Sequence, residues 1–225
     1  NQSYIMHLAV GTSLAIIVPT SIASVLTHHK FNAVDVDIVK SYGIHVIIGV
    51  IFGAIFAASL DTKSLILFFT TVIYLLGIYL LFIKEKETQI NLKISFLTKM
   101  IFGFAVGFIS APMGIGGAIM NVPILKFFGY SINRAIGSAA AIGFFIAVFG
   151  AFGFLILGFF LKANLPLSIG FINIPAFLIF IPITTIMARI GANTVHKIEK
   201  NKISKLFGIF LIIVASKFLY DYFQF

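Results

Sequence analysis

The sequence predicts an all-α polytopic membrane protein, and its composition and its long apolar stretches are the two observations that predict it. Of the 225 residues, 60% are hydrophobic and only 10% are charged, whereas a water-soluble domain of this size needs a more polar surface. Six stretches have the roughly 20 consecutive, mostly apolar residues of a membrane-spanning helix. These stretches are residues 8–27, 41–60, 64–83, 135–161, 169–188 and 203–222.

A further apolar stretch, residues 97–133, is interrupted by the sequence APMGIGGAIMNVP at residues 111–123. Pro112 and Pro123 each remove a backbone donor and act as helix breaks or hinges, and the glycines between them allow left-handed backbone. Two interpretations are open here. The stretch is either one long kinked span or a re-entrant hairpin of two short helices that meet between Pro112 and Gly117.

The distribution of the 16 Lys and Arg residues favours the hairpin. If residues 97–133 cross the membrane once, each side carries eight basic residues, which specifies no orientation. If the stretch enters and returns, thirteen of them share one side, and the more basic side is normally cytoplasmic. The thirteen are Lys30, Lys40, Lys84, Lys86, Lys93, Lys99, Lys126, Arg134, Arg189, Lys197, Lys200, Lys202 and Lys205, and the other three are Lys63, Lys162 and Lys217.

The chain also contains a weak internal repeat. The sequence AVGTSLA at residues 9–15 resembles AIGSAAA at residues 135–141, and two further spans follow each copy. With a hairpin, each unit crosses the membrane an odd number of times, so we predict an inverted repeat of three spanning helices plus a glycine-rich broken-helix hairpin. Residues 1–83 form the first repeat, 84–96 a basic cytoplasmic linker and 97–225 the second repeat. We expect the hairpin of the first repeat to be missing, so that this repeat is incomplete at its N-terminus.

The broken stretch is the predicted binding site. A half-helix that begins near Ala118 directs its first N–H groups and the positive end of its dipole into an unwound turn, and this suits an anion. The seven acidic residues all lie in predicted loops or at span ends, so cation sites and carboxylate proton relays lack their usual groups. The predicted substrate-binding residues are Gly114, Gly116, Gly117, Ala118, Asn121, Ser138, Thr12 and Ser13, with Asn173 as a further amide.

Other roles are weighed against this one. Glycines also serve close helix packing in membranes, and we expect that role for Gly103, Gly107, Gly150 and Gly153. The chain has no cysteine and no HExxH spacing, so we predict no catalytic residue, no metal ligand, no cofactor and no enzyme activity. The net charge of +9 is assigned to membrane orientation rather than to nucleic acid.

Several motifs, in one order, resemble the sulfite exporter TauE/SafE family of membrane permeases. They are LAVGTSLAIIVPTSIASVLTHHKFNAVD (8–35), GFISAPMGIGGAIMNVPIL (107–125), RAIGSAAAIGF (134–144), GFINIPAFLIFIPITTIMARIGANTVHKI (170–198) and LFGIFLIIVASKFL (206–219). The chain departs from the family's pattern at Ala118, where a third consecutive glycine is expected. The second departure is that the glycine-rich hairpin expected in the first half is missing.

The resemblance implies a secondary transporter that moves sulfite, an organosulfonate or a similar small sulfur-containing anion across a bacterial inner membrane. Its partners would be this anion and the lipid bilayer, and a homo-oligomer is compatible with the plan. The alternatives are a permease for another small organic anion and a non-transporting assembly or sensor subunit. An intramembrane enzyme is disfavoured because the residue pairs that catalysis needs are missing.

Overall fold

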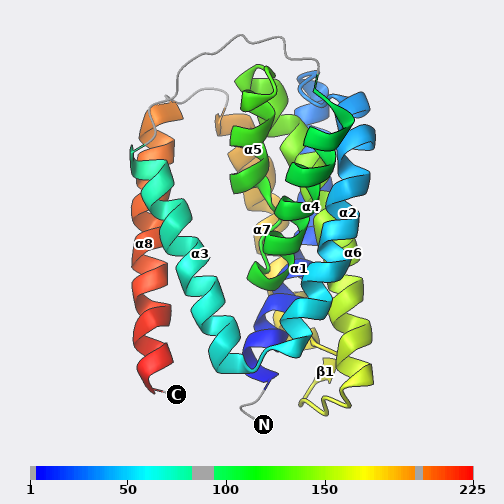
Figure 1. The fold of residues 1–225 in the computed structure, drawn as a ribbon, viewed down its shortest axis with the longest axis vertical. Helices are drawn as coiled ribbons and strands as arrows, with labels where there is room; N and C mark the ends of the chain where they lie inside the picture. Colours follow the sequence, from blue (N-terminus) through cyan, green and yellow to red (C-terminus); the bar gives the residue numbers. More distant parts are fainter. Residues whose placement is uncertain (1–3, 83–93, 196–199, 225) are drawn as a thin grey trace.

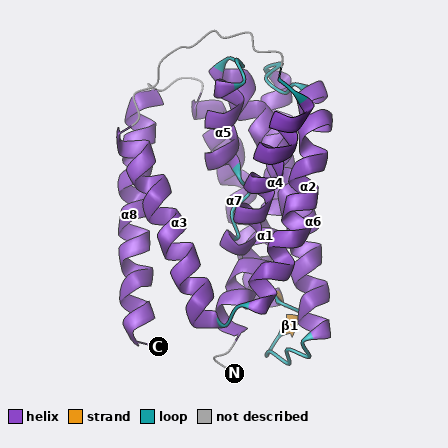
Figure 2. Ribbon diagram, in the orientation of Figure 1, coloured by secondary structure: helices purple, strands orange, loops and turns teal. Residues whose placement is uncertain are grey.

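The computed structural model describes residues 4–82, 94–195 and 200–224. These ranges are almost entirely helical (Figure 2). In chain order the elements are α1 (Ile5–Lys30), α2 (Val36–Ser59), α3 (Thr62–Phe82), α4 (Phe96–Met113), α5 (Ala118–Phe127), α6 (Ile132–Phe160), β1 (Ser168–Ile169), β2 (Ile172–Asn173), α7 (Ile174–Val195) and α8 (Lys200–Gln224).

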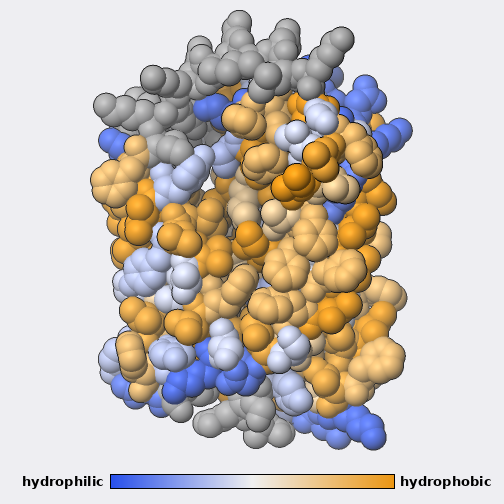
Figure 3. All heavy atoms as spheres, viewed as in Figure 1, coloured by the Kyte–Doolittle hydropathy of each residue, from blue (hydrophilic) through white to orange (hydrophobic). Residues whose placement is uncertain are grey.

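The described helices confirm the predicted fold class, an all-α polytopic membrane protein. Seven of them are long and apolar enough to cross a membrane, namely the six predicted spans and α4. In Figure 3 apolar side chains cover the middle of the visible face, and hydrophilic side chains gather toward its two ends. This banding is the surface expected of a helical bundle whose middle lies in the hydrocarbon of a bilayer.

One span begins later than expected, because α7 starts at Ile174 and not near residue 169. The residues before it pair as a short antiparallel hairpin, in which Ser168 lies opposite Asn173. Gly170, in the left-handed region with φ of +57°, allows the tight turn. Asn173 then caps α7, since its Oδ1 accepts the N–H of Ala176 at 3.0 Å.

The interrupted stretch folds as a helical hairpin. α4 begins and α5 ends at the same end of the bundle, and the turn between them lies inside it (Figure 1). Both left-handed residues of the turn are glycines, Gly114 with φ of 65° and Gly117 with φ of 67°. Pro112 and Pro123 lie inside α4 and α5 respectively, so the break itself depends on the glycines.

Backbone-to-backbone packing holds α4 against α2. A Cβ added at Gly107 would overlap the carbonyl oxygen of Val46, and one at Gly49 would overlap that of Phe104. A Cβ added at Gly103 would overlap the Cβ of His45. These contacts confirm the packing role predicted for Gly103 and Gly107, because only residues without a side chain let two helices approach this closely.

The two predicted repeats make α1 correspond to α6, α2 to α7 and α3 to α8. The main contacts among these helices are the same when corresponding helices are exchanged. α1 packs against α6 and α7, α6 packs against α1 and α2, and α3 packs against α8. α1 and α6 run in opposite directions, as do α3 and α8 (Figure 1). This pattern supports the inverted repeat, although the division into two repeats and the missing first hairpin stay predictions. The basic linker lies mostly outside the described residues.

The sidedness of the bundle is testable with single cysteines, because the chain has none of its own. Lys40 and Asn133 stand near the starts of α2 and α6, and Lys63 and Lys162 near the opposite end; all four are exposed. We expect cysteines at 40 and 133 to react with an impermeant thiol reagent only from the cytoplasmic side, and those at 63 and 162 only from the other. Reaction of positions 40 and 133 from opposite sides would contradict the hairpin.

Candidate functional site

The turn at residues 114–117 lies between α1 and α6. On one side the hydroxyl of Ser13 donates a hydrogen bond to the carbonyl oxygen of Gly114 at 2.8 Å. On the other side the carbonyl oxygen of Gly116 fills the space that a Cβ at Gly143 would need. A broken helix therefore ends in the interior of the bundle, held by one helix from each predicted repeat.

The N-terminus of α5 opens into this turn. Its N-cap is Gly117, which has no side chain to cap the helix. The carbonyl oxygen of Gly117 accepts the N–H groups of Met120 and Asn121 at 3.2 and 2.9 Å. The N–H groups of the first helical positions, starting at Ala118, have no partner within the helix. They carry the positive end of the helix dipole, which attracts anions.

Two buried polar side chains face the same place. Ser110, at the end of α4, is 1% exposed, and Asn121, on α5, is 0% exposed. Within the described chain the hydroxyl of Ser110 and the Nδ2 of Asn121 have no hydrogen-bond partner. A Cβ added at Gly117 would lie 3.1 Å from Ser110 Oγ and 3.2 Å from Asn121 Nδ2. Both atoms thus border one point beside Gly117, and each costs about 1–3 kcal/mol while it lacks a partner.

Tyr42 from α2 fixes the direction of the Asn121 amide. Its hydroxyl donates to Asn121 Oδ1 at 3.2 Å, and Tyr42 is itself fully buried. Because this bond uses the acceptor end of the amide, the donor end, Nδ2, is the end that borders Gly117. Sequence reasoning missed both Tyr42 and Ser110. Ser110 lies in the quoted glycine motif, whereas Tyr42 carries no local signal because its contact spans two distant segments.

Thr12 and Ser138 have equivalent structural partners. The hydroxyl of Thr12 accepts the N–H of Asn173 at 2.9 Å, and the hydroxyl of Ser138 accepts the N–H of Asp35 at 2.9 Å. Asn173 caps α7 and Asp35 caps α2. Each hydroxyl therefore binds the residue that caps a helix of the other predicted repeat.

The glycines beside these hydroxyls make the two contacts possible. A Cβ at Gly11 would overlap the carbonyl oxygen of Phe171, and one at Gly137 would overlap that of Ala33. Gly11–Thr12 and Gly137–Ser138 occupy the same positions in AVGTSLA and AIGSAAA. We call these two arrangements the repeat clamps.

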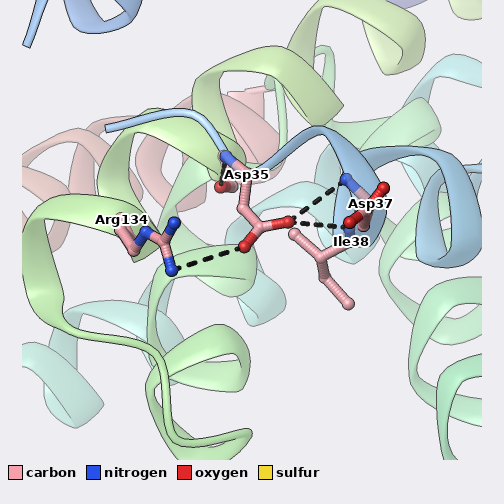
Figure 4. Close-up of polar contacts among 5 residues, drawn as sticks. Asp35, Asp37, Ile38 and Arg134 are labelled. Atoms are coloured by element: carbon pink, nitrogen blue, oxygen red, sulfur yellow. Dashed lines mark hydrogen bonds and ion pairs between the residues drawn. The ribbon is translucent and has the colours of Figure 1, made fainter. Parts of the chain in front are cut away.

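The clamp at Ser138 includes charged groups that its counterpart lacks. The carboxylate of Asp35 accepts the N–H groups of Asp37 and Ile38 at 3.1 and 3.2 Å, and its other oxygen lies 3.7 Å from Nη1 of Arg134 (Figure 4). Arg134 is more than half exposed, so solvent weakens this ion pair. The cluster is a helix cap at one end of the bundle.

Of the predicted site residues, the structure brings Gly114, Gly117, Asn121 and Ser13 together around the turn, with Ala118 as the first residue of α5. Gly116 lies in the turn without a left-handed backbone. Thr12, Ser13 and Asn173 line a groove of about 610 Å³ between α1 and α7. Ser13 connects the groove to the turn, since it lines the groove and also donates a hydrogen bond to Gly114.

The donors around the turn are neutral. They are backbone N–H groups, one hydroxyl and one amide, all of which can donate to the oxygen atoms of an anion. Within the described residues no three His, Cys, Asp or Glu side chains are grouped as metal ligands. The arrangement can bind an anion through hydrogen bonds and the helix dipole, without a formal positive charge.

The two neighbouring glycines provide a matched test of the turn. Gly117→Ala forces a side chain into left-handed backbone, which costs about 1–2 kcal/mol, and its Cβ would also overlap Ile146. At Gly116 the nearest atom to an added Cβ is a side-chain methyl of Ile17 at 3.2 Å. We expect Gly117→Ala to lower the thermal unfolding temperature in detergent and Gly116→Ala to change it little. Equal effects would show that the left-handed glycine is not required.

Comparison with known proteins agrees with the architecture. The model of the sulfite exporter TauE/SafE family matches residues 3–218. A "Probable membrane transporter protein" of Haemophilus influenzae is 32% identical over 95% of this chain and 81% of its own length. The "Probable membrane transporter protein YdhB" of Bacillus subtilis is 26% identical over 68% of this chain and 65% of its own length. No solved structure matches the chain. The chain belongs to the sulfite exporter TauE/SafE family and is a multi-pass membrane transporter, not an enzyme.

Proposed function

We propose that the protein moves a small sulfur-containing anion, such as sulfite or an organosulfonate, across the bacterial inner membrane, and that this anion binds beside Gly117. One observation carries the proposal. Among the residues that the structure describes, the buried hydroxyl of Ser110 and the buried Nδ2 of Asn121 find no hydrogen-bond partner, and both border the N-terminus of α5. A ligand that accepts hydrogen bonds would satisfy both atoms and the helix N–H groups together.

The charge distribution supports an anion over a cation. In the described ranges the acidic residues are Asp35, Asp37, Asp61 and Asp221, and each lies at or near an end of a helix. The turn inside the bundle therefore has donors and a positive dipole end but no carboxylate, the group that cation sites in membranes normally use. Neutral donors also hold an anion weakly enough for release.

The chemistry of sulfur oxyanions supports the narrower substrate class. Sulfite and sulfonates present three oxygen atoms on one centre, so that one anion can accept bonds from Ser110, Asn121 and the α5 backbone at once. The family to which the chain belongs is described as sulfite exporters. The equivalent repeat clamps support a transport cycle in which the two repeats rock against each other around this site. The inner membrane and a homo-oligomer belong to the same proposal.

Flux into proteoliposomes tests the proposal. We expect saturable uptake of sulfite and methanesulfonate by vesicles that contain the protein, and no comparable uptake of potassium. Acetate is the informative third anion, because it has one oxygen fewer than a sulfonate. Equal flux of acetate and methanesulfonate would favour a general organic-anion permease, and absence of flux for all anions would favour a non-transporting subunit.

A negative charge introduced at the site tests the role of Asn121. Asn121→Asp keeps an acceptor for Tyr42 but places a negative charge near the N-terminus of α5, whereas Asn121→Ala only removes the amide. In a poorly solvated site the repulsion of a bound anion reaches several kcal/mol, so we expect the Asp variant to bind sulfite far more weakly than the Ala variant. Titration of both variants with sulfite in matched lipid and salt measures the difference.

Asn173→Asp is the matched control, because it introduces the same charge at the cap of α7. An acidic cap is favourable at a helix N-terminus, so we expect its affinity for sulfite to change much less. Equal affinity of the Asn121→Asp and Asn121→Ala variants would remove Asn121 from the site.

A further inference from the structure

We infer that Ile146, on α6, closes the site beside Gly117 and limits the size of the anion that the site accepts. The closing role rests on geometry alone, and the size limit rests on the proposed function. Ile146 is fully buried. A Cβ added at Gly117 would overlap its Cδ1, and the same added atom would contact Ser110 Oγ and Asn121 Nδ2. One methyl group and two polar atoms without partners thus surround one point.

This combination of neighbours is unfavourable unless another group takes the methyl's place. A methyl group neither donates nor accepts hydrogen bonds, so Cδ1 of Ile146 leaves the hydroxyl and the amide unsatisfied. Each buried polar group without a bond carries a desolvation penalty. The two polar atoms and the adjacent N–H groups of α5 are satisfied when Cδ1 withdraws and an acceptor enters. The structure therefore corresponds to the closed form of the site.

The closing atom is also the most easily moved part of its side chain. Cδ1 is the end of the isoleucine, and rotation about χ2 between staggered wells moves it while Cβ and Cγ2 stay packed. The backbone of the turn is held more firmly, because the carbonyl oxygen of Gly116 lies where a Cβ at Gly143 would be. Opening of the site thus requires a side-chain rotation at Ile146.

The same methyl group limits the size of the ligand. Sulfite carries no substituent beyond its oxygen atoms, whereas an alkylsulfonate carries a carbon chain on sulfur that needs space next to the bound oxygens. Discrimination against one additional methylene in an apolar pocket is typically about 10–200-fold. Removal of Cδ1 by Ile146→Val is therefore expected to favour the larger anion.

A labelling experiment tests the closing role without any transported anion. The chain has no cysteine of its own, so Ser110→Cys places one reporter thiol in the site. Ile146→Val is compared with Ile142→Val, which removes the same methyl from an equally buried isoleucine on α6. We expect a small methanethiosulfonate reagent to modify the reporter thiol about tenfold faster with Ile146→Val, the lower limit of what one methylene supplies, and at an unchanged rate with Ile142→Val. Equal rates in the two backgrounds would overturn the closing role.

A binding experiment with Ser110 intact tests the size limit. Thermal protection by sulfite and by ethanesulfonate gives the affinity of each anion for the unmodified protein and the two valine variants. We expect Ile146→Val to raise the ethanesulfonate-to-sulfite affinity ratio about tenfold and Ile142→Val to leave it unchanged. An unchanged ratio in both variants would overturn the size limit but leave the proposed function intact. If neither anion protects any form, the proposed function fails and the size limit fails with it, while the labelling rates still decide the closing role.

Discussion

The whole arrangement depends on the requirement that a helix broken inside an apolar bundle must still satisfy its backbone. Lipid offers no hydrogen bonds, so each N–H or C=O group that the break frees needs a partner elsewhere. Two carbonyl oxygens of the turn have hydrogen-bond donors. The oxygen of Gly114 accepts the hydroxyl of Ser13, and the oxygen of Gly117 accepts two N–H groups of α5. The donors at the start of α5 have no such partner within the helix. The break is thus electropositive, which is why an anion suits it.

Close packing of glycines keeps this unbalanced turn in place. Gly49 and Gly107 bring α2 and α4 together at the level of their backbones, and Gly143 does the same for α6 and the turn. Helices packed at such distances have little freedom to slide, because there is no empty space between their backbones to move into. The position of Tyr42 against Asn121 follows from that contact, since Tyr42 lies on the helix that α4 packs against.

The similarity between AVGTSLA and AIGSAAA has a structural counterpart in the two repeat clamps. Thr12 and Ser138 are also predicted as hydroxyls that suit a bound anion. Both hydroxyls accept the N–H of a capping residue, Asn173 or Asp35. The likeness therefore reflects a contact that each repeat makes with the other. The paired contacts at opposite ends of the bundle are what an inverted repeat requires, although binding at these two residues stays untested.

What could be predicted from the sequence follows from the range of each physical effect. Span positions depend on local hydrophobicity, and the start of α5 at Ala118 depends on two adjacent glycines, so both were accessible from short windows. The β1–β2 hairpin was missed because Ile169, Phe171 and Ile172 extend the apolar stretch of the helix that follows. Ser110 was missed because a lone serine two residues before a proline resembles any helix end.

Two contacts could not be predicted from short sequence windows. They are the contact of Tyr42 with Asn121 and that of Ile146 with the space beside Gly117. Each joins segments that are remote in sequence, and nothing in either segment distinguishes these residues from the many other aromatic and aliphatic side chains of the spans. Local patterns therefore locate a helix end that attracts an anion, whereas the groups that orient its donors and close it are fixed by packing alone. One motif thus supplies the donors of the proposed site, and the side chains proposed to orient these donors and to limit the size of the ligand lie on α2 and α6, one helix from each predicted repeat.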